Sequence, residues 1–244
     1  MSEARTAIVT GAGKRVGAAI TQGLLDDGWQ VAAHVHHQDD DVPDRAVKVV
    51  ADLADPGCAE AIFEAASDLP PVRLLVNNAA RFAHDGFGEF STAEFAAHMA
   101  INVQAPALLI ERLALAQDGM NDALIVNLLD SKVVAPNPDY LSYTLSKQAF
   151  AGLTELAARA LASKGIRVNG IAPGLMLRSS GQSEENFGVM HVANPLGRGV
   201  TADDVMGAIR YLIGAKCLTG QVLVIDSGQR FMALDRDVQF LGSA

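Results

Sequence analysis

The chain has 244 residues, of which 50% are hydrophobic and 19% are charged, so it can bury a large core and is too apolar for a disordered protein. Its formal net charge of −9 argues against a nucleic acid or an anionic membrane as a partner. Cys58 and Cys217 form neither a disulfide framework nor a metal-ligand spacing, and we expect no bound metal. The N-terminus has no signal-peptide-like apolar stretch and no apolar run is long enough for a membrane span, which predicts a cytoplasmic protein.

Short β-branched runs alternate with longer Ala- and Leu-rich segments along the whole chain. The pattern predicts strands at 6–10, 30–36, 46–51, 74–77, 124–129, 167–171 and 222–225. Helices are expected between them, at 16–27, 59–67, 94–117, 141–164 and 202–212. This alternation predicts one α/β domain over residues 1–244, with a doubly wound, seven-stranded parallel sheet flanked by helices. The segment 176–200 has no clear pattern, and a stretch of that length in a compact domain is typical of a lid.

A glycine-rich turn, "TGAGKRVG" (10–17), joins the first predicted strand to the first predicted helix. Gly11, Gly13 and Gly17 allow a tight turn and a close approach to a diphosphate, while the helix N-terminus offers free N–H groups and a positive dipole end. Such a turn can also be simple loop geometry. Its place after the first strand of an alternating chain favours a dinucleotide site.

The second predicted strand ends in "HVHHQDDD" (34–41). An NAD-binding protein usually has an acid here that holds the ribose 2′-hydroxyl. This chain instead has basic side chains at the strand end and in the facing turn, namely His34, His36, His37, Lys14 and Arg15. They would suit a 2′-phosphate, which favours NADPH. Alternatively the histidines are ordinary surface residues, and the acids at 39–41 would oppose a phosphate if they fold back on the site.

An acid ends the most apolar strand, "IVNLL" (125–129), which is followed directly by Asp130. Tyr143 and Lys147 follow four residues apart, so they project from the same side of a helix. A nearby ammonium favours the phenolate and is expected to lower the tyrosine pKa toward neutrality, as proton transfer requires. The alternatives are a strand-end turn or helix cap for Asp130 and a partly exposed surface pair for Tyr143 and Lys147.

These motifs together resemble the short-chain dehydrogenase/reductase family over nearly the whole chain. The resemblance is carried by the glycine-rich turn and by "VNNAA" (76–80), "INVQAP" (101–106), "VNLLDS" (126–131), "YTLSK" (143–147), "RVNGIAPG" (167–174) and "TGQVLVIDSG" (219–228). It implies a Rossmann fold, hydride transfer from a nicotinamide, a small-molecule substrate and a homotetramer. It also implies an active site made of Asn, Ser, Tyr and Lys.

Three of these active-site positions match as Asn102, Tyr143 and Lys147, but the serine position holds Asp130. In the family, the asparagine anchors a water chain to the lysine, and as a poor helix former Asn102 is also expected to mark a local kink. A second departure is Arg15, which replaces the middle glycine of the turn. The pteridine reductases and their bacterial dihydropteridine-reducing relatives share both departures.

Three further features resemble that branch. "GKRVG" (13–17) is similar to its turn, and "AHVHHQ" (33–38) is similar to its His-rich strand end. Phe82 stands where the branch stacks an aromatic ring on the pterin. His37 differs, because the branch commonly has an arginine there that contacts the 2′-phosphate. Ala80 and Met176 differ from serines of the protozoan enzymes. Phe82 can alternatively be a core residue, and Arg15 a solvated residue at the helix start rather than a bridge between phosphate and pterin.

The resemblance and the motifs together define a candidate site. Asp130, Tyr143, Lys147 and Asn102 are the expected catalytic residues, and Arg15, Phe82, Asp130 and Tyr143 are the expected substrate contacts. Asp52 is placed near the adenine amino group, with a role as a turn or cap acid as the alternative. The expected NADPH contacts are Gly11, Lys14, Arg15, Val16, His34, His36, His37, Asp52, Leu53, Asn78, Ala79, Ala80, Tyr143, Lys147, Pro173, Gly174 and Leu175.

Three functions remain open from the sequence. The first is NADPH-dependent reduction of a C=N bond in a dihydropterin or in dihydrofolate. The second is the reduction of a carbonyl group, as in 3-oxoacyl reductases and sugar or alcohol dehydrogenases. The third is a catalytically inactive nucleotide-binding protein. Asp130 favours the first, because an ionised carboxylate has no proton to donate to a developing alkoxide.

Overall fold

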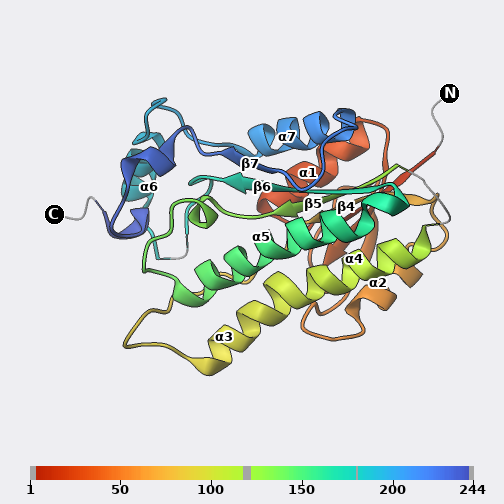
Figure 1. The fold of residues 1–244 in the computed structure, drawn as a ribbon, viewed down its shortest axis with the longest axis horizontal. Coiled ribbons are helices and arrows are strands. Elements are labelled where there is room, and N and C mark those ends of the chain that lie inside the picture. The colour runs from red at the N-terminus through yellow and green to blue at the C-terminus, as the bar shows by residue number, and fades with distance from the viewer. Residues whose placement is uncertain (1–3, 118–121, 180, 242–244) are drawn as a thin grey trace.

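A computed structural model describes residues 4–117, 122–179 and 181–241 of the protein (Figure 1). Seven strands form one sheet in the order β3-β2-β1-β4-β5-β6-β7, and all neighbouring strands are parallel. The strands are β1 Thr6–Val9, β2 Gln30–Val35, β3 Val47–Val50, β4 Val72–Asn77, β5 Ala123–Leu128, β6 Ile166–Pro173 and β7 Val222–Ile225. The helices are α1 Arg15–Asp26, α2 Cys58–Ala65, α3 Thr92–Met99, α4 Ala105–Ala116, α5 Leu141–Leu161, α6 Glu184–Val192 and α7 Ala202–Gly214.

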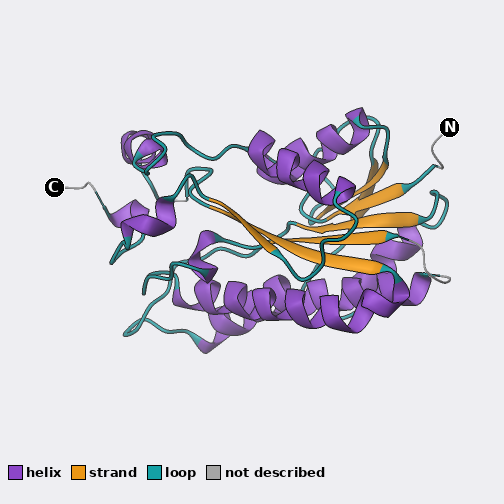
Figure 2. Ribbon diagram, turned by 45° about the horizontal axis from the view of Figure 1, so that its top comes forward, coloured by secondary structure: helices purple, strands orange, loops and turns teal. Residues whose placement is uncertain are grey.

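Helices cover both faces of the sheet, so the strands are buried on both sides (Figure 2). In strand β1, successive side chains point to opposite faces of the sheet and pack into two different cores. Ile8 points into the core shared with α2, α4 and α5, whereas Ala7 and Val9 point into the core shared with α1 and α7. A strand buried on both faces needs a continuous apolar run, which is the pattern that the sequence shows. The predicted doubly wound α/β fold is confirmed.

The predicted helix 94–117 is divided into α3 and α4 by a π-helical turn, Ala100–Gln104. Asn102 lies in this turn and is buried. The local irregularity expected at Asn102 is therefore present, and π-helical turns of this kind occur frequently at functional sites. By length and composition, the stretch Thr92–Ala116 is apolar enough to cross a membrane. Its α4 half, however, packs Leu109 and Leu113 into the core beside the sheet, as a helix of a globular domain does.

The segment 176–200, in which the sequence shows no clear pattern, contains the helix α6. Ser183 caps α6 by accepting a hydrogen bond from the backbone N–H of Asn186 at 3.0 Å. Of the α6 side chains only Met190 is buried. Without an apolar stripe along one side, the helix leaves no periodic signal in the sequence.

Candidate functional site

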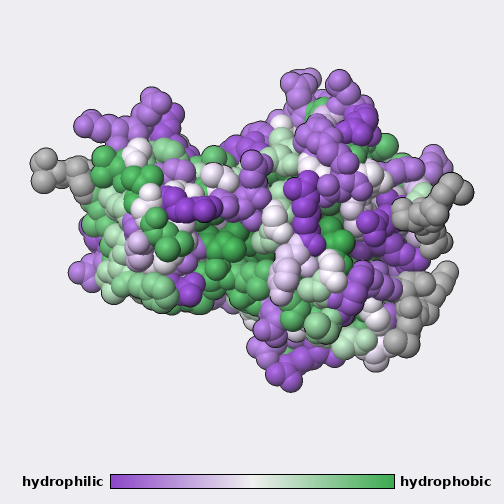
Figure 3. Space-filling model, turned by 90° about the horizontal axis from the view of Figure 1, so that it is seen from above, coloured by the Kyte–Doolittle hydropathy of each residue, from purple (hydrophilic) through white to green (hydrophobic). Residues whose placement is uncertain are grey.

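A cavity of about 570 Å³ opens where the order of the strands reverses, beyond the carboxyl ends of the central strands. Parallel α/β sheets commonly bind ligands at this position, because the connections on either side leave in opposite directions. In the space-filling view, hydrophobic residues gather in a hollow between the α6 end of the molecule and the α7 side (Figure 3). The cavity walls include all the residues predicted to contact the cofactor or the substrate.

The glycine-rich turn brings β1 and the start of α1 into close contact. A Cβ on Gly17 would lie 1.9 Å from the Gly11 carbonyl oxygen, so only glycine fits there. Arg15 is the first residue of α1 and has a φ of 55°, a left-handed value that usually requires glycine. Asn78 at the end of β4 donates to the carbonyl oxygens of Thr10 and Gly11 at 2.8 and 3.2 Å. These contacts fix the turn in the cavity wall at the N-terminus of α1.

His34 differs from the role predicted for it. Its ring is buried, its Nδ1 accepts a hydrogen bond from the Gly11 N–H at 3.2 Å, and its Nε2 donates to the Ala51 carbonyl oxygen at 3.0 Å. Burial lowers the pKa of His34, which favours this neutral tautomer. Both ring nitrogens are used to tie the turn to the sheet. His34 therefore lines the cavity but has no free nitrogen for a phosphate.

His36 and His37 are exposed at the rim of the cavity, with ring centroids 4.1 Å apart. One of the neighbouring acids does fold back on this region. The Asp40 carboxylate lines the cavity and accepts a hydrogen bond from the His37 backbone N–H at 3.0 Å, which lowers the pKa of Asp40. Asp52 accepts from the Ala54 N–H at 2.9 Å and lies 3.8 Å from His36, so its present contacts are those of a turn acid.

Asp130 lies two residues beyond the end of β5 and caps a short 3-10 helix, Ser131–Val133. Its Oδ1 accepts from the Lys132 backbone N–H at 2.8 Å, and its Oδ2 accepts from the Tyr143 hydroxyl at 2.9 Å. Removal from bulk water raises the pKa of Asp130, although these two hydrogen bonds stabilise the carboxylate. Asp130 is thus a helix cap, which was the alternative prediction for it, and it also accepts a hydrogen bond from Tyr143.

Tyr143 and Lys147 both lie in the first part of α5, and both side chains are buried. Burial lowers the pKa of Lys147 to about 8, and its Nζ donates to the Leu128 carbonyl oxygen at 2.6 Å. Burial and the negative charge of Asp130 raise the pKa of Tyr143 well above its usual value. The lowering expected from Lys147 is therefore not found in the protein alone, because burial and then the Asp130 carboxylate both raise the pKa of Tyr143.

Asn102 lies beneath the cavity rather than in its wall. Its Oδ1 accepts from the Arg81 backbone N–H at 2.7 Å, and its Nδ2 donates to the Arg81 carbonyl oxygen at 3.0 Å and to the Ser146 hydroxyl at 2.9 Å. These bonds fix the segment that carries Phe82 and the helical turn that carries Lys147. Of the four predicted catalytic residues, the structure brings Asp130, Tyr143 and Lys147 together in the cavity wall.

Phe82 is 41% exposed and lines the cavity, so it is not a core residue. Its ring stacks on Tyr140 with centroids 4.3 Å apart and meets the edge of Tyr143 at 4.7 Å. Tyr140 has a φ of 57° and stands just before α5. Tyr140 was not among the residues predicted from the sequence, because the left-handed conformation of a bulky residue leaves no signal there.

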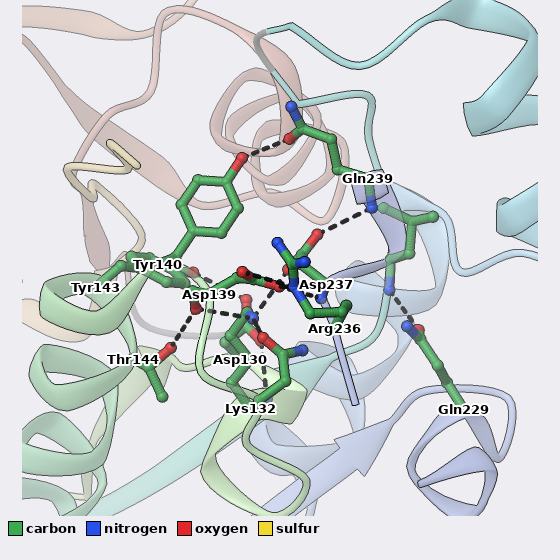
Figure 4. A network of polar contacts seen from close by, with 12 residues as sticks. Asp130, Lys132, Asp139, Tyr140, Tyr143, Thr144, Gln229, Arg236, Asp237 and Gln239 are labelled. Carbon is green, nitrogen blue, oxygen red and sulfur yellow. Dashed lines mark hydrogen bonds and ion pairs between the residues drawn. The ribbon is translucent and has the colours of Figure 1, made fainter. Parts of the chain in front are cut away.

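A group of charged residues that was not predicted from the sequence lies beside the Asp130–Tyr143 pair (Figure 4). Lys132 and Asp237 line the cavity and form an ion pair at 2.8 Å. Lys132 stands only two residues after Asp130, which was a usable signal. Asp237 belongs to the C-terminal part of the chain, and nothing in its sequence neighbourhood indicates a place in the site. Within the described ranges, no group of three or more His, Cys, Asp or Glu side chains is arranged to hold a metal ion.

Comparison with known proteins places this site in a family. A family model described as enoyl-(acyl carrier protein) reductase matches residues 11–230. The pteridine reductase 1 of Leishmania tarentolae is 31% identical over 92% of this chain and 96% of its own length. The 3-oxoacyl-[acyl-carrier-protein] reductase FabG of Staphylococcus epidermidis is 27% identical over 92% of this chain and 98% of its own. The structure of FolM alternative dihydrofolate reductase 1 from Brucella canis, complexed with NADP, is 35% identical, with a TM-score of 0.88 over 93% of this chain and 94% of that one. The chain belongs to the short-chain dehydrogenase/reductase family.

Proposed function

We propose that the protein is an NADPH-dependent reductase that acts on a C=N bond of a dihydropterin-type substrate, with dihydrofolate in the same class. The observation that carries the proposal is the hydrogen bond from the Tyr143 hydroxyl to the Asp130 carboxylate at 2.9 Å. Tyr143 has an acid as its partner, where a carbonyl reductase of the family has a serine. The similarity to a pteridine reductase and to FolM alternative dihydrofolate reductase 1 supports the same substrate class.

The chemistry of the site suits protonation of a ring nitrogen. Bound NADPH supplies the hydride. Tyr143 keeps its proton at neutral pH because its pKa is raised, so it can donate this proton to the nitrogen that gains charge. Asp130 orients the hydroxyl, and its carboxylate can accept hydrogen bonds from substrate N–H groups. We expect Lys147, whose pKa is about 8, to hold the nicotinamide ribose and to help replace the proton.

The cavity fits a dinucleotide phosphate at its other end. The glycine-rich turn, kept tight by Gly17, and the N-terminus of α1 together form a cradle for a diphosphate. Exposed cationic groups for a 2′-phosphate come from Lys14, His36 and His37. Asp40 lies among them, and we expect its negative charge to weaken the affinity for the 2′-phosphate. The bound NADP of FolM alternative dihydrofolate reductase 1 supports the choice of cofactor.

The substrate end of the cavity is aromatic and partly apolar. The exposed face of the Phe82 ring offers a stacking surface for a flat heterocycle, and its other contacts with Tyr140 and Tyr143 hold it in place. Arg15 reaches from the glycine-rich turn to the Arg178 carbonyl oxygen, 3.1 Å away. Through this contact the turn meets the segment 176–200, which we propose as a lid that moves when ligands bind.

Carbonyl reduction is the second candidate function, and one observation favours it. Burial raises the pKa of Asp130, and a protonated Asp130 could donate a hydrogen bond to a carbonyl oxygen as a serine does. The 27% identity to a 3-oxoacyl-[acyl-carrier-protein] reductase is consistent with this. An inactive nucleotide-binding protein has less support, because Tyr143 and Lys147 are both present in the cavity wall.

We also propose that the protein is a cytoplasmic homotetramer. Helices α4 and α5 carry large exposed apolar side chains, Leu115 on α4 and Leu145 and Leu156 on α5. We expect these side chains to contribute to contacts between subunits, because large exposed apolar areas mark protein–protein contacts. The measurement is the molar mass in solution, and a monomer at micromolar concentration contradicts the proposal.

One panel of assays tests the proposed function. The oxidation of NADPH is followed with dihydropterins, dihydrofolate and 3-oxoacyl thioesters as substrates. We expect turnover with the dihydropterin-type compounds and little with the thioesters. Turnover of the thioesters alone would replace the proposed function by carbonyl reduction, and no turnover of any substrate would favour the inactive nucleotide-binding protein.

A further inference from the structure

The chain returns to the candidate site at its C-terminal end. Residues 235–241, here named the C-terminal segment, are bound to the loop that precedes α5. The Asp139 carboxylate accepts hydrogen bonds from the Arg236 Nε at 2.8 Å and from the Asp237 backbone N–H at 2.7 Å. The Tyr140 hydroxyl donates to the Gln239 side chain. Figure 4 shows these contacts meeting beside Asp130 and Tyr143.

Lys132 joins this segment to the strand that carries Asp130. Its Nζ donates to the Asp237 Oδ2 at 2.8 Å and to the Asn137 Oδ1 at 2.7 Å. The side chains of Lys132 and Asp237 are only 8% and 10% exposed. Burying an ion pair costs much of the attraction that it provides, so such a pair adds little stability compared with apolar residues of the same size. Its place in a cavity wall therefore points to a role in the reaction.

The C-terminal segment also supplies part of the cavity wall. Asp237 and Val238 line it, and Ala233 and Leu234, which precede the segment, line it as well. Loss of the ion pair would leave the part of the segment around Asp237 held by Asp139, while the Tyr140 hydroxyl, the ring contact of Tyr140 with Phe240 and the bond from Asn186 to Leu241 hold the residues that follow. We expect the wall then to loosen next to Phe82, where the substrate ring is proposed to lie.

Opposite charges surround the proposed proton donor. The groups that face Asp130 are Tyr143 and Lys147 from α5, Lys132 from the short 3-10 helix, and Asp237 from the C-terminal segment. The positive charge of Lys132 lowers the pKa of Asp130, against the larger effect of burial. The negative charge of Asp237 raises the pKa of Tyr143, in addition to burial and Asp130. The two charges therefore act on the donor pair in opposite directions.

We propose that Lys132 and Asp237 are positioning residues for the reaction, whose ion pair fixes the C-terminal segment as the wall of the substrate end and balances the charge around Asp130 and Tyr143. The role as a wall rests on the geometry alone. The effect on proton transfer rests on the proposed function. Neither residue is a catalytic residue, because each acts through the segment or through the donor pair.

The test compares Lys132→Met and Asp237→Asn with the parent, and Arg210→Gln serves as a control that breaks an exposed ion pair with Asp27. For dihydropterin reduction, the pH above which kcat falls reports the proton donor. Lys132→Met removes a positive charge, so this pH should rise by roughly one unit, and Asp237→Asn should lower it by a similar amount. Arg210→Gln should not move it. Shifts in the same direction, or no shift, overturn the electrostatic part of the proposal.

Hydrogen exchange of residues 235–241 gives a readout that needs no turnover. Measured on the NADPH-loaded protein, exchange should be at least severalfold faster in both variants than in the parent and in Arg210→Gln. Parent-like exchange overturns the role as a wall. If the parent itself fails to reduce dihydropterins, the proposed function is wrong, and the exchange result still decides the role of the ion pair.

A double variant, Lys132→Met with Asp237→Asn, covers the case in which one unpaired buried charge unfolds a single variant. Because it removes both charges, it should fold, and its pH profile should lie close to that of the parent. Its exchange in 235–241 should remain fast. A double variant with parent-like exchange contradicts the proposal.

Discussion

Tyr143 donates its hydroxyl proton to a carboxylate, Asp130, that has no other side-chain partner among the hydrogen bonds described, at an oxygen–oxygen distance of 2.9 Å. The contact joins the residues that follow the C-terminal end of β5 to the N-terminal end of α5. Because burial raises the pKa of both groups, the pair holds at least one proton at neutral pH. A proton donor is thus present before any ligand binds.

Replacement of Asp130 by serine tests this donor pair. We expect Asp130→Ser to reduce dihydropterin turnover by roughly 100-fold, in line with the loss of an acid–base partner. The serine restores the hydroxyl of a carbonyl reductase, so weak ketone reduction should appear. The measurements are kcat/KM for a dihydropterin and for a ketone, with circular dichroism to check the fold. Parent-like dihydropterin turnover would show that the carboxylate is not catalytic.

Replacement of Phe82 by alanine tests the stacking surface. The change should weaken substrate binding by roughly 1 kcal/mol, about fivefold, because an aromatic contact is lost. The affinity for NADPH should stay within a factor of two, since Phe82 lies at the substrate end. Dissociation constants for the two ligands separate these effects. A loss of NADPH affinity or of thermal stability alone would assign Phe82 a structural role.

The exposed histidines predict a preference between the two cofactors. His36 and His37 line the cavity with exposed imidazoles that suit a 2′-phosphate, so the parent should bind NADPH more tightly than NADH. In the double variant His36→Ala, His37→Ala this preference should be reduced. Asp40→Asn should increase the affinity for NADPH, because a carboxylate is removed from the phosphate end. Equal affinities for both cofactors in the parent at pH 6 would contradict the assignment.

Lys147 predicts a dependence of protein stability on pH. Its pKa is lowered to about 8 by burial, against a usual value of 10.5. Between these two values the unfolded chain binds more protons than the folded protein, so this residue makes the free energy of unfolding rise with pH. Below pH 8 the buried Lys147 side chain is charged, which lowers the free energy of unfolding. Urea unfolding at pH 7.5 and pH 9.5 should therefore show a smaller rise, or a fall, in Lys147→Met than in the parent.

Much of the fold was predictable from the sequence because strands buried on both faces produce continuous apolar runs. The sheet, with its predicted strands, and the helix carrying Tyr143 and Lys147 were found in this way. Helix α6 was missed because only one of its side chains is buried, which leaves no periodicity. His34 was assigned to the phosphate because histidine is a basic residue. In the structure both of its ring nitrogens are used in hydrogen bonds, which depends on the tertiary fold and cannot be read from the sequence.

The C-terminal residues of the site could not be found by the same means. Asp237 reaches Lys132 across more than one hundred positions of the chain, and no local pattern encodes that contact. The left-handed conformation of Tyr140 is likewise imposed by its surroundings. Sequence motifs identify functional residues that lie close together in the chain. A cavity wall assembled from distant segments can be identified only from the three-dimensional structure.

The hydrogen bond from Gly11 to His34 has a consequence for how a nucleotide is held. Because the Gly11 N–H is already donated to an imidazole at 3.2 Å, it has no hydrogen left for a phosphate oxygen. The anion-binding capacity of this turn must then come from the amides further along, at the beginning of α1, and from the side chains of Lys14 and Arg15. The exposed side chains of Lys14 and Arg15 supply two positive charges to an anion site that has one backbone donor fewer. The diphosphate should accordingly be held more by charge and less by fixed amides, and its affinity should fall steeply as the salt concentration rises.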